Sequence, residues 1–264
     1  MFYKVFNFWV IINFWFFASC TPVSLGDLEI SSPSGVLSDT LAIPVSDVGF
    51  YDEQSYETYV HRQSRQSAVR VQVEYPGMTV YGSGTYMKWR GHTVVVTAAH
   101  LFAFSSPKTL DSEAVIVTPS EKVFGKLVYV DEYVDIAVFA VPKLQSRKAA
   151  TFNRAQSFEI GDPVVYSGFP GPNNLLTFDG SITGAGHTTD IVIQSFAWPG
   201  SSGSGVYNSK GELVGIVVSI MVGGGPSGSQ LLGSLVYVAP ANLIDSAYLF
   251  QNLQKLKRTR NAGF

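Results

Sequence analysis

The chain has 264 residues, of which 46% are hydrophobic and 14% are charged, and its formal net charge is −2. This length and composition fit one large all-β domain or two small ones with a sizeable core, and the near-zero charge argues against nucleic acid as a partner. The single cysteine, Cys20, excludes an intrachain disulfide, so the folded part must be held by its hydrophobic core.

The first twenty residues have the pattern of an export signal. Lys4 is the only charge among them, and Val5–Phe17 is almost wholly apolar. A basic start, a short apolar run and then small residues are typical of a secretion signal. Phe17-Ala18-Ser19-Cys20 resembles a bacterial lipoprotein signal, in which the cysteine is lipidated after cleavage, although Phe17 stands where an aliphatic residue is usual. An ordinary signal peptide with an incidental cysteine and an uncleaved anchor both stay open.

We therefore expect an exported protein, either secreted or held in the periplasm or cell envelope. Membrane contact is expected only through the N-terminal segment or its lipid. Residues 21–66 are rich in Ser, Pro and Asp and are predicted to be a tether or loosely ordered extension. The other predicted boundaries are a folded domain over 67–250, with strands over about 67–145 and about 155–240 and a helix over about 242–256, and a solvated basic tail over 257–264.

Short strand-like segments recur through the predicted domain. Val69, Val71 and Val73 alternate with polar residues, which predicts a half-buried strand, and Pro76-Gly77 predicts the turn after it. Similar short apolar segments follow at close spacing between Gly- and Pro-rich turns, with no long amphipathic helix among them. This pattern predicts an all-β sandwich or barrel.

Two polar residues lie at the ends of apolar strands in the first half. His100 follows Val94–Ala99, whose small last residues leave the imidazole accessible to a second side chain. Asp135 is embedded in apolar residues and needs a hydrogen-bond donor if it is buried, which a histidine N–H supplies. A histidine satisfied at a strand end and an aspartate in a turn are the structural alternatives, and Asp131 is a local competitor of Asp135.

A run of small residues, Pro199–Val206, follows in the second half. The backbone can turn sharply here, so that Ser202 presents its hydroxyl while the amides of Gly200 and Ser202 point at one oxygen. A nucleophile beside two such donors is what acyl transfer requires. Taken alone, this run is weak evidence for a catalytic site, because Gly-Ser stretches are usually flexible loops.

The three motifs together resemble those of the chymotrypsin-fold serine proteases, in which His, Asp and Ser follow one another in this order. The matching segments are Thr97-Ala98-Ala99-His100, Asp135-Ile136-Ala137-Val138 and Gly200-Ser201-Ser202-Gly203-Ser204. The resemblance covers roughly residues 68–248 and implies two six-stranded antiparallel β-barrels with a C-terminal helix. It also implies a catalytic triad of His100, Asp135 and Ser202 at the seam between the barrels, and an oxyanion hole made by the Gly200 and Ser202 amides.

Further segments are similar to bacterial members, the HtrA type and the glutamyl endopeptidases: Gly82-Ser83-Gly84, Gly168-Phe169-Pro170 and Gly211–Ile216. No PDZ-like domain is expected after the terminal helix. Ser201 stands where trypsin-like zymogens have an aspartate that pairs with a new N-terminus, so activation by such a cleavage is not expected. Val217 stands where glutamyl endopeptidases have a specificity histidine, so a preference for glutamate is not expected.

The residues expected to line the substrate pocket are Phe196, Val217 and Ser219. Because Phe196 offers no acid to hold Arg or Lys, an apolar or small substrate side chain is expected. No metal or organic cofactor is implied, because the remaining histidines show no ligand spacing. Those histidines are His61, His92 and His187.

The function predicted from the sequence is a serine endopeptidase that acts on polypeptides through an acyl-enzyme. Two other hypotheses stay open: a catalytically idle protease-fold protein that binds or scaffolds in the cell envelope, and an esterase on the same fold. The sequence indicates no oligomeric state.

Overall fold

The computed structural model describes residues 58–102, 112–152, 158–186, 189–225 and 228–262. All of them belong to the unit formed by residues 51–264. The predicted export signal with Cys20 lies outside the described residues, as does His187.

The first half of the described chain forms a closed antiparallel barrel with the spatial order β1-β2-β3-β6-β5-β4. Its strands are β1 (Ala68–Tyr75), β2 (Met78–Trp89), β3 (His92–Ala98), β4 (Glu113–Val117), β5 (Lys122–Asp131) and β6 (Ile136–Ala140). Val69, Val71 and Val73 are buried in β1, so the strand predicted from their alternation is confirmed. Gly77, with φ +81, makes the predicted turn into β2.

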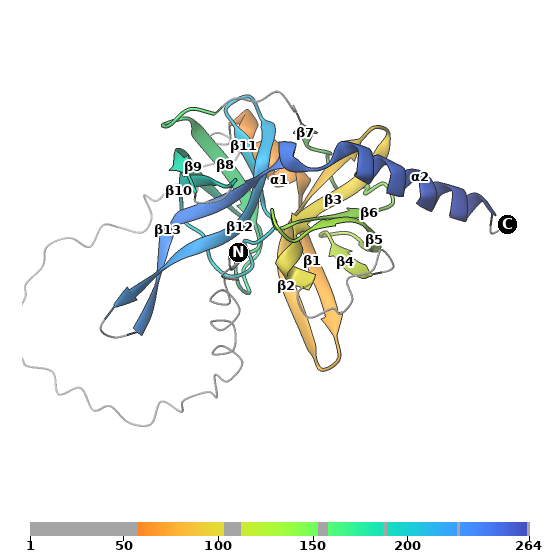
Figure 1. Cartoon of the computed structure of the whole chain (residues 1–264), viewed down its shortest axis with the longest axis horizontal. Helices are drawn as coiled ribbons and strands as arrows, with labels where there is room; N and C mark the ends of the chain where they lie inside the picture. Colours follow the sequence, from red (N-terminus) through yellow and green to blue (C-terminus); the bar gives the residue numbers. More distant parts are fainter. Residues whose placement is uncertain (1–57, 103–111, 153–157, 187–188, 226–227, 263–264) are drawn as a thin grey trace, which may run out of the picture. The chain divides into compact units, whose positions relative to one another are not determined.

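The second half forms a ring with the order β11-β8-β9-β10-β13-β12, which a pairing between β11 and β12 closes, and β7 joins β12 in parallel. The strands are β7 (Thr151–Phe152), β8 (Pro163–Gly168), β9 (Leu176–Ala185), β10 (Ile191–Gln194), β11 (Gly205–Asn208), β12 (Glu212–Gly225) and β13 (Gly228–Pro240). The two six-stranded barrels confirm the predicted fold class (Figure 1).

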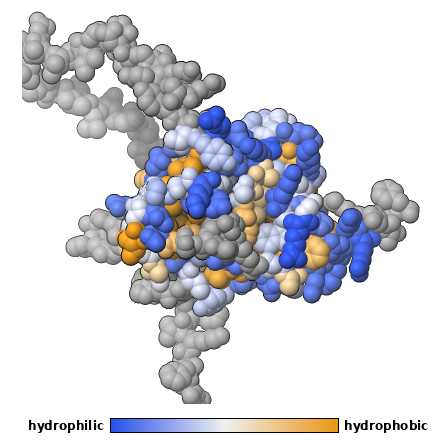
Figure 2. Space-filling view, turned by 90° about the horizontal axis from the view of Figure 1, so that it is seen from above, coloured by the Kyte–Doolittle hydropathy of each residue, from blue (hydrophilic) through white to orange (hydrophobic). Residues whose placement is uncertain are grey.

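Each barrel has an apolar core, and the first core continues into the second barrel. Tyr207 of β11 and Leu213 and Ile216 of β12 belong to the same buried cluster as Phe139 of β6. Burial of these side chains fixes the two barrels against each other, and with them the loops at the seam. On the face seen in Figure 2, hydrophilic side chains cover most of the described surface and apolar ones occur in small groups.

Helix α1 (Tyr59–Ser67) precedes the first barrel but packs on β8 of the second. Its buried residues are polar: Gln63, Ser64 and Ser67. The Ser64 hydroxyl donates to Ser167 Oγ at 2.8 Å, and the Ser67 and Tyr207 hydroxyls are 2.5 Å apart. The prediction of a loosely ordered extension through residue 66 is therefore wrong for residues 59–66.

Helix α2 (Ser246–Ala262) covers β5 and follows a short 3-10 turn, η4 (Ala241–Leu243). The helix starts four residues later than predicted, because the Asp245 carboxylate accepts from the amides of Ala247 and Tyr248 at 2.9 and 3.1 Å and so caps the first turn. Within the described ranges, no helix is both long and apolar enough to span a membrane.

Candidate active site

His100 and Asp135 are brought together by the pairing of two strands in the first barrel. β3 and β6 pair antiparallel, with Ala98 opposite Ile136. His100 lies just beyond the end of β3, in the 3-10 turn η3 (Ala99–Phe102), and Asp135 lies just before β6. The strand register therefore places the two residues beside each other at one end of the barrel.

Asp135 contacts His100 at both of its carboxylate oxygens. Oδ2 lies 2.7 Å from His100 Nδ1, and Oδ1 accepts from the His100 backbone amide at 2.7 Å. The Asp135 carbonyl also accepts from the Ala99 amide, at 3.1 Å. These contacts fix Nδ1 as the ring nitrogen that faces the carboxylate and leave Nε2 available for a second hydrogen-bond partner.

The surroundings of Asp135 differ from the prediction in one respect. We expected a buried carboxylate, but the Asp135 side chain is 27% exposed and its φ is +58, in the left-handed region. Asp131 is the turn residue instead, because its carboxylate accepts from the Tyr133 and Val134 amides at 2.9 and 3.2 Å.

The loop that carries Ser202 turns between two glycines in the left-handed region, Gly200 at φ +101 and Gly203 at φ +89. Of its three serines, Ser201 is 1% and Ser204 is 0% exposed, whereas Ser202 is half-buried. Ser202 is thus the serine of this loop whose side chain substrate can reach. A Cβ on Gly200 would lie 2.6 Å from the Phe169 carbonyl oxygen, so the close approach there requires glycine.

Ser202 lies on the same side of the seam as His100. A Cβ built on Gly82 of β2 would lie 2.5 Å from Leu101 Cδ1 and 3.1 Å from the Ser202 carbonyl oxygen. The side chain of Leu101, the residue after His100, and the backbone of Ser202 therefore both pack closely against Gly82. A larger residue there would push these two segments apart.

The Gly200 and Ser202 amides are not engaged with any acceptor among the described residues. The peptide planes around them are fixed by other contacts. The Pro199 carbonyl accepts from the Gly171 amide at 2.7 Å, and the Ser202 carbonyl accepts from the Ser83 amide at 2.8 Å. Two backbone N–H groups that have no acceptor within the described ranges, and whose neighbours are held by hydrogen bonds, are suited to bind an oxygen that gains negative charge.

Ser201 fills the position of the zymogen aspartate with neutral contacts. The Trp198 amide donates to its hydroxyl at 3.3 Å, and its own amide donates to the Trp198 carbonyl at 2.8 Å. Beside it, the Tyr166 hydroxyl donates to the Phe196 carbonyl, and burial raises the pKa of Tyr166 far above its ordinary value. The loop is thus held in the structure without an ionic pair at this position.

The three predicted pocket residues have different environments. Val217 is 2% exposed and packs in the second core, so it acts on the loop through its backbone: its carbonyl accepts from the Gly203 amide at 2.7 Å. Phe196 is 53% exposed, with its ring 5.7 Å from that of Phe178, and Ser219 is exposed. A common pocket formed by the three stays a prediction.

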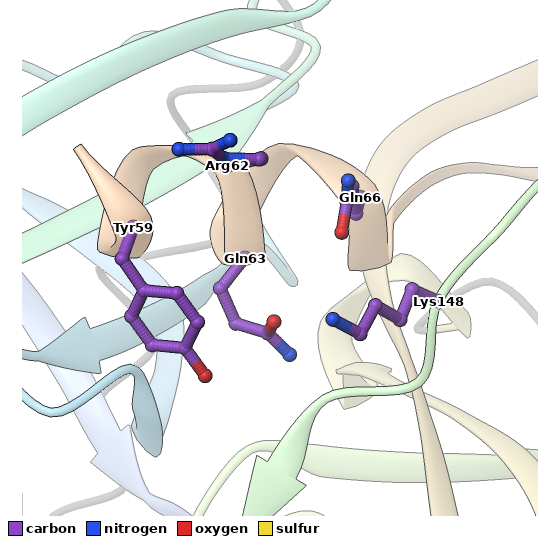
Figure 3. Close-up of a pocket in the computed structure, with 5 residues that line it drawn as sticks. All are labelled: Tyr59, Arg62, Gln63, Gln66 and Lys148. Atoms are coloured by element: carbon purple, nitrogen blue, oxygen red, sulfur yellow. The ribbon is translucent and has the colours of Figure 1, made fainter. Parts of the chain in front are cut away.

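A cavity of about 310 Å³ lies between α1 and Lys148 (Figure 3). Its lining contains none of the predicted site residues and no acidic side chain: Tyr59, Arg62, Gln63, Gln66 and Lys148. Within the described ranges, no three His, Cys, Asp or Glu side chains cluster closely enough to hold a metal ion.

One residue of this site had no role in the sequence interpretation. In the sequence Ser83 stands out only as part of a glycine-flanked motif, yet its backbone and hydroxyl contact the loop that carries Ser202 from the first barrel. Its flanking glycines, Gly82 and Gly84, were the available signal, because a Cβ at either position would press on a neighbouring side chain.

Two closed barrels with a His–Asp pair and a serine-bearing glycine turn at their seam define a protein of the chymotrypsin-fold class. The trypsin-like peptidase domain family matches residues 82–216, and the chain belongs to this family. Two relatives named serine protease Do-like HtrA, from Lactococcus lactis subsp. lactis and subsp. cremoris, are 32% identical over 177 residues. The match covers 61% of this chain and 42% of each relative's length.

Two solved structures share the fold. The serine endoprotease from Yersinia pestis has a TM-score of 0.57 and 20% identity over 75% of this chain and 65% of its own. A protease from M. tuberculosis in its active form has a TM-score of 0.56 and 20% identity over 77% of this chain and 86% of its own. The resemblance to HtrA-type proteases that the motifs predicted is thereby confirmed.

Proposed function

We propose that the protein is a serine endopeptidase that cleaves peptide bonds through a triad of His100, Asp135 and Ser202. The observation that carries the proposal is the two-point contact of Asp135 with His100, made beside the loop in which Ser202 is the accessible serine. Family membership supports the same reaction class.

The chemistry follows from these positions. His100 Nε2 takes the hydroxyl proton of Ser202 as Oγ attacks the substrate carbonyl, and then delivers that proton to the leaving amine as the C–N bond breaks. The negative charge on the carbonyl oxygen is met by the Gly200 and Ser202 amides. Water then attacks the acyl-enzyme with His100 again as base, and the Ser202 hydroxyl is restored. Asp135 keeps the ring oriented and stabilises its protonated form.

A fluorophosphonate probe and casein hydrolysis test the proposal on the full chain. The protein is expected to be labelled and to cleave casein, and Ser202→Ala is expected to lose labelling and about a million-fold in turnover. Ser204→Ala is the matched control, because it removes a hydroxyl two residues away that is fully buried. Unlabelled protein without casein cleavage, or a Ser202→Ala variant with full turnover, would contradict the proposal.

Export is a further part of the proposal, and it is supported by the Lys4 start and the apolar run of residues 5–17. Residues 1–20 fused to a reporter enzyme that is active only outside the cytoplasm should produce activity. Labelled palmitate should be incorporated into the full chain and not into Cys20→Ser if the cysteine carries lipid. Reporter inactivity would contradict export, and equal labelling of both chains would contradict lipidation of Cys20.

A further inference from the structure

Ser83 is a buried residue of the first barrel whose polar groups bond to the loop of the second. It lies in β2 and is 0% exposed. Its amide donates to the Ser202 carbonyl at 2.8 Å, and its hydroxyl donates to the Gly200 carbonyl at 2.7 Å. The same hydroxyl accepts from the Phe169 amide at 2.9 Å, so it both donates and accepts a hydrogen bond.

These contacts reach both residues whose amides form the proposed oxyanion hole. Bonds to the Gly200 and Ser202 carbonyls fix the peptide planes that follow the two amides. The bond from the Phe169 amide also ties Ser83 to the segment that contains Gly171. Gly171 donates to the Pro199 carbonyl at 2.7 Å and so fixes the peptide plane that contains the Gly200 amide. One hydroxyl thus joins the nucleophile loop to the segment that supports it.

Ser83 is itself fixed by the first barrel. Its carbonyl accepts from the Thr97 hydroxyl at 2.6 Å, and Thr97 is a fully buried residue of β3. The strand that precedes His100 and the loop that carries Ser202 are therefore both bonded to one residue, the strand to the Ser83 carbonyl and the loop to its hydroxyl and amide. A rigid barrel residue can hold a glycine-rich loop that has no strong conformational preference of its own.

We infer that Ser83 is a positioning residue that holds the oxyanion loop in its reactive arrangement, through the bond from its hydroxyl to the Gly200 carbonyl. The inference rests on the proposed peptidase function. A loop in which Ser201 replaces the ion-paired aspartate depends on neutral hydrogen bonds for its order, and Ser83 supplies two of them. Loss of its hydroxyl frees the Gly200 carbonyl and the Phe169 amide together, while the backbone bond to Ser202 stays.

The local packing offers a matched control in the same place. A Cβ on Gly168 would overlap Ser204 Oγ and would lie 2.8 Å from Ser83 Oγ, so both hydroxyls border one small volume. Both serines are 0% exposed, but Ser204 Oγ has no hydrogen-bond partner among the residues that the structure describes. Ser204→Ala therefore removes a buried hydroxyl next to the loop without removing a bond to it.

The test compares Ser83→Ala, Ser204→Ala and Ser67→Ala in the full chain, by kcat and KM on a chromogenic peptide and by thermal unfolding. Ser83→Ala is expected to lower kcat by about 10- to 100-fold, less than the loss of an oxyanion donor itself, with KM changed by less than about threefold. Ser204→Ala should stay within about twofold of wild type. Ser67→Ala, which breaks buried hydroxyl bonds away from the loop, should shift the unfolding midpoint but not kcat.

A kcat for Ser83→Ala within about twofold of wild type, or a loss no greater than that of Ser67→Ala, would overturn the inference and leave the proposed function intact. An inactive wild-type chain would overturn the proposed function and this inference with it. If Ser83→Ala does not fold, Ser83→Gly, which also keeps the backbone amide and adds no volume, is held to the same kcat thresholds.

Discussion

Asp135 holds His100 by its ring and by its backbone at the same time, with 2.7 Å at each contact. The backbone bond at Oδ1 fixes the carboxylate plane, so that Oδ2 stays where it meets the Nδ1 of the ring. Asp135 also has a φ of +58, a conformation that Asp and Asn adopt more readily than most residues. Asparagine should therefore keep the backbone and change only what the ring meets.

We predict that Asp135→Asn lowers kcat by about ten-thousand-fold, because an amide donor facing Nδ1 selects the wrong ring tautomer. The thermal unfolding midpoint should move by only a few degrees, a shift worth about 1 kcal/mol. Asp131→Asn is the control, since Asp131 closes a turn and does not touch His100. Steady-state kinetics on a peptide substrate decide the matter, and an Asp135→Asn variant within tenfold of wild type would contradict the assigned role.

Local patterns predicted an all-β sandwich or barrel and singled out His100 and Asp135, whereas the two-barrel fold and the pairing of these residues were implied by the family resemblance. Alternation at Val69, Val71 and Val73 marks a strand, and a polar residue directly after or before an apolar strand marks a site position, as with His100 and Asp135. The partial exposure of Asp135 was not predictable, because the apolar run on one side of a residue does not show what covers its other side.

Helix α1 and Ser83 were missed for a different physical reason. The buried face of α1 consists of Gln63, Ser64 and Ser67, so the helix has no apolar stripe for a periodicity argument to detect. Its order comes from hydroxyl bonds to residues more than a hundred positions away. Ser83 likewise gains its role from Gly200, 117 residues further along the chain.

A second prediction concerns the crowded volume at Gly168. Gly168→Ala should destabilise the fold by about 1–3 kcal/mol, because its Cβ would overlap the Ser204 hydroxyl. Ser204→Ala alone should cost nothing or stabilise slightly, since it deletes a buried hydroxyl that has no hydrogen-bond partner in the described part of the chain. In the double variant the nearest Ser204 atom is Cβ, at 3.2 Å, so at least half of the loss should return. Urea unfolding of wild type, the two single variants and the double variant measures these free energies. Effects of the two substitutions that simply add in the double variant would contradict the prediction.

A third prediction follows from the buried tyrosine of β11. Burial raises the pKa of Tyr207 well above the ordinary value of about 10. Because the unfolded chain releases this proton first, the contribution of Tyr207 to stability is complete below about pH 10 and is lost as the pH rises above it. Tyr207→Phe should lower the free energy of unfolding by about 1 kcal/mol at pH 8, because it loses the Ser67 contact. It should also reduce the fall of the free energy of unfolding at alkaline pH.

Chemical unfolding of wild type and of the Tyr207→Phe variant at pH 8, 10 and 11 measures the slope of the free energy of unfolding against pH. Tyr133→Phe is the control, because Tyr133 is 77% exposed. Burial also raises the pKa of Tyr166, Tyr86 and Tyr129, so these tyrosines contribute to the decline that remains in Tyr207→Phe. An unchanged slope in Tyr207→Phe would show that the buried hydroxyl does not set the alkaline limit of the fold.

The last prediction asks whether α1 is a structural part of the second barrel. Ser67 is fully buried and its hydroxyl meets Tyr207, whereas Ser64 donates to Ser167, which keeps a second contact with Thr177 at 3.0 Å. Ser67→Ala should therefore destabilise the chain more than Ser64→Ala, and the two together by about 2–3 kcal/mol, because each leaves a buried polar group with fewer partners.

Urea unfolding of the single and double variants provides the measurement, with Ser209→Ala as an exposed control outside the helix. Proteolysis adds an independent readout, because a loosened α1 should be cut at Arg62 or Arg65 by added trypsin before the barrels are. If the double variant unfolds at the wild-type urea concentration and resists cleavage equally, the hydroxyl bonds do not hold α1, and its packing on β8 must rest on contacts other than these serines.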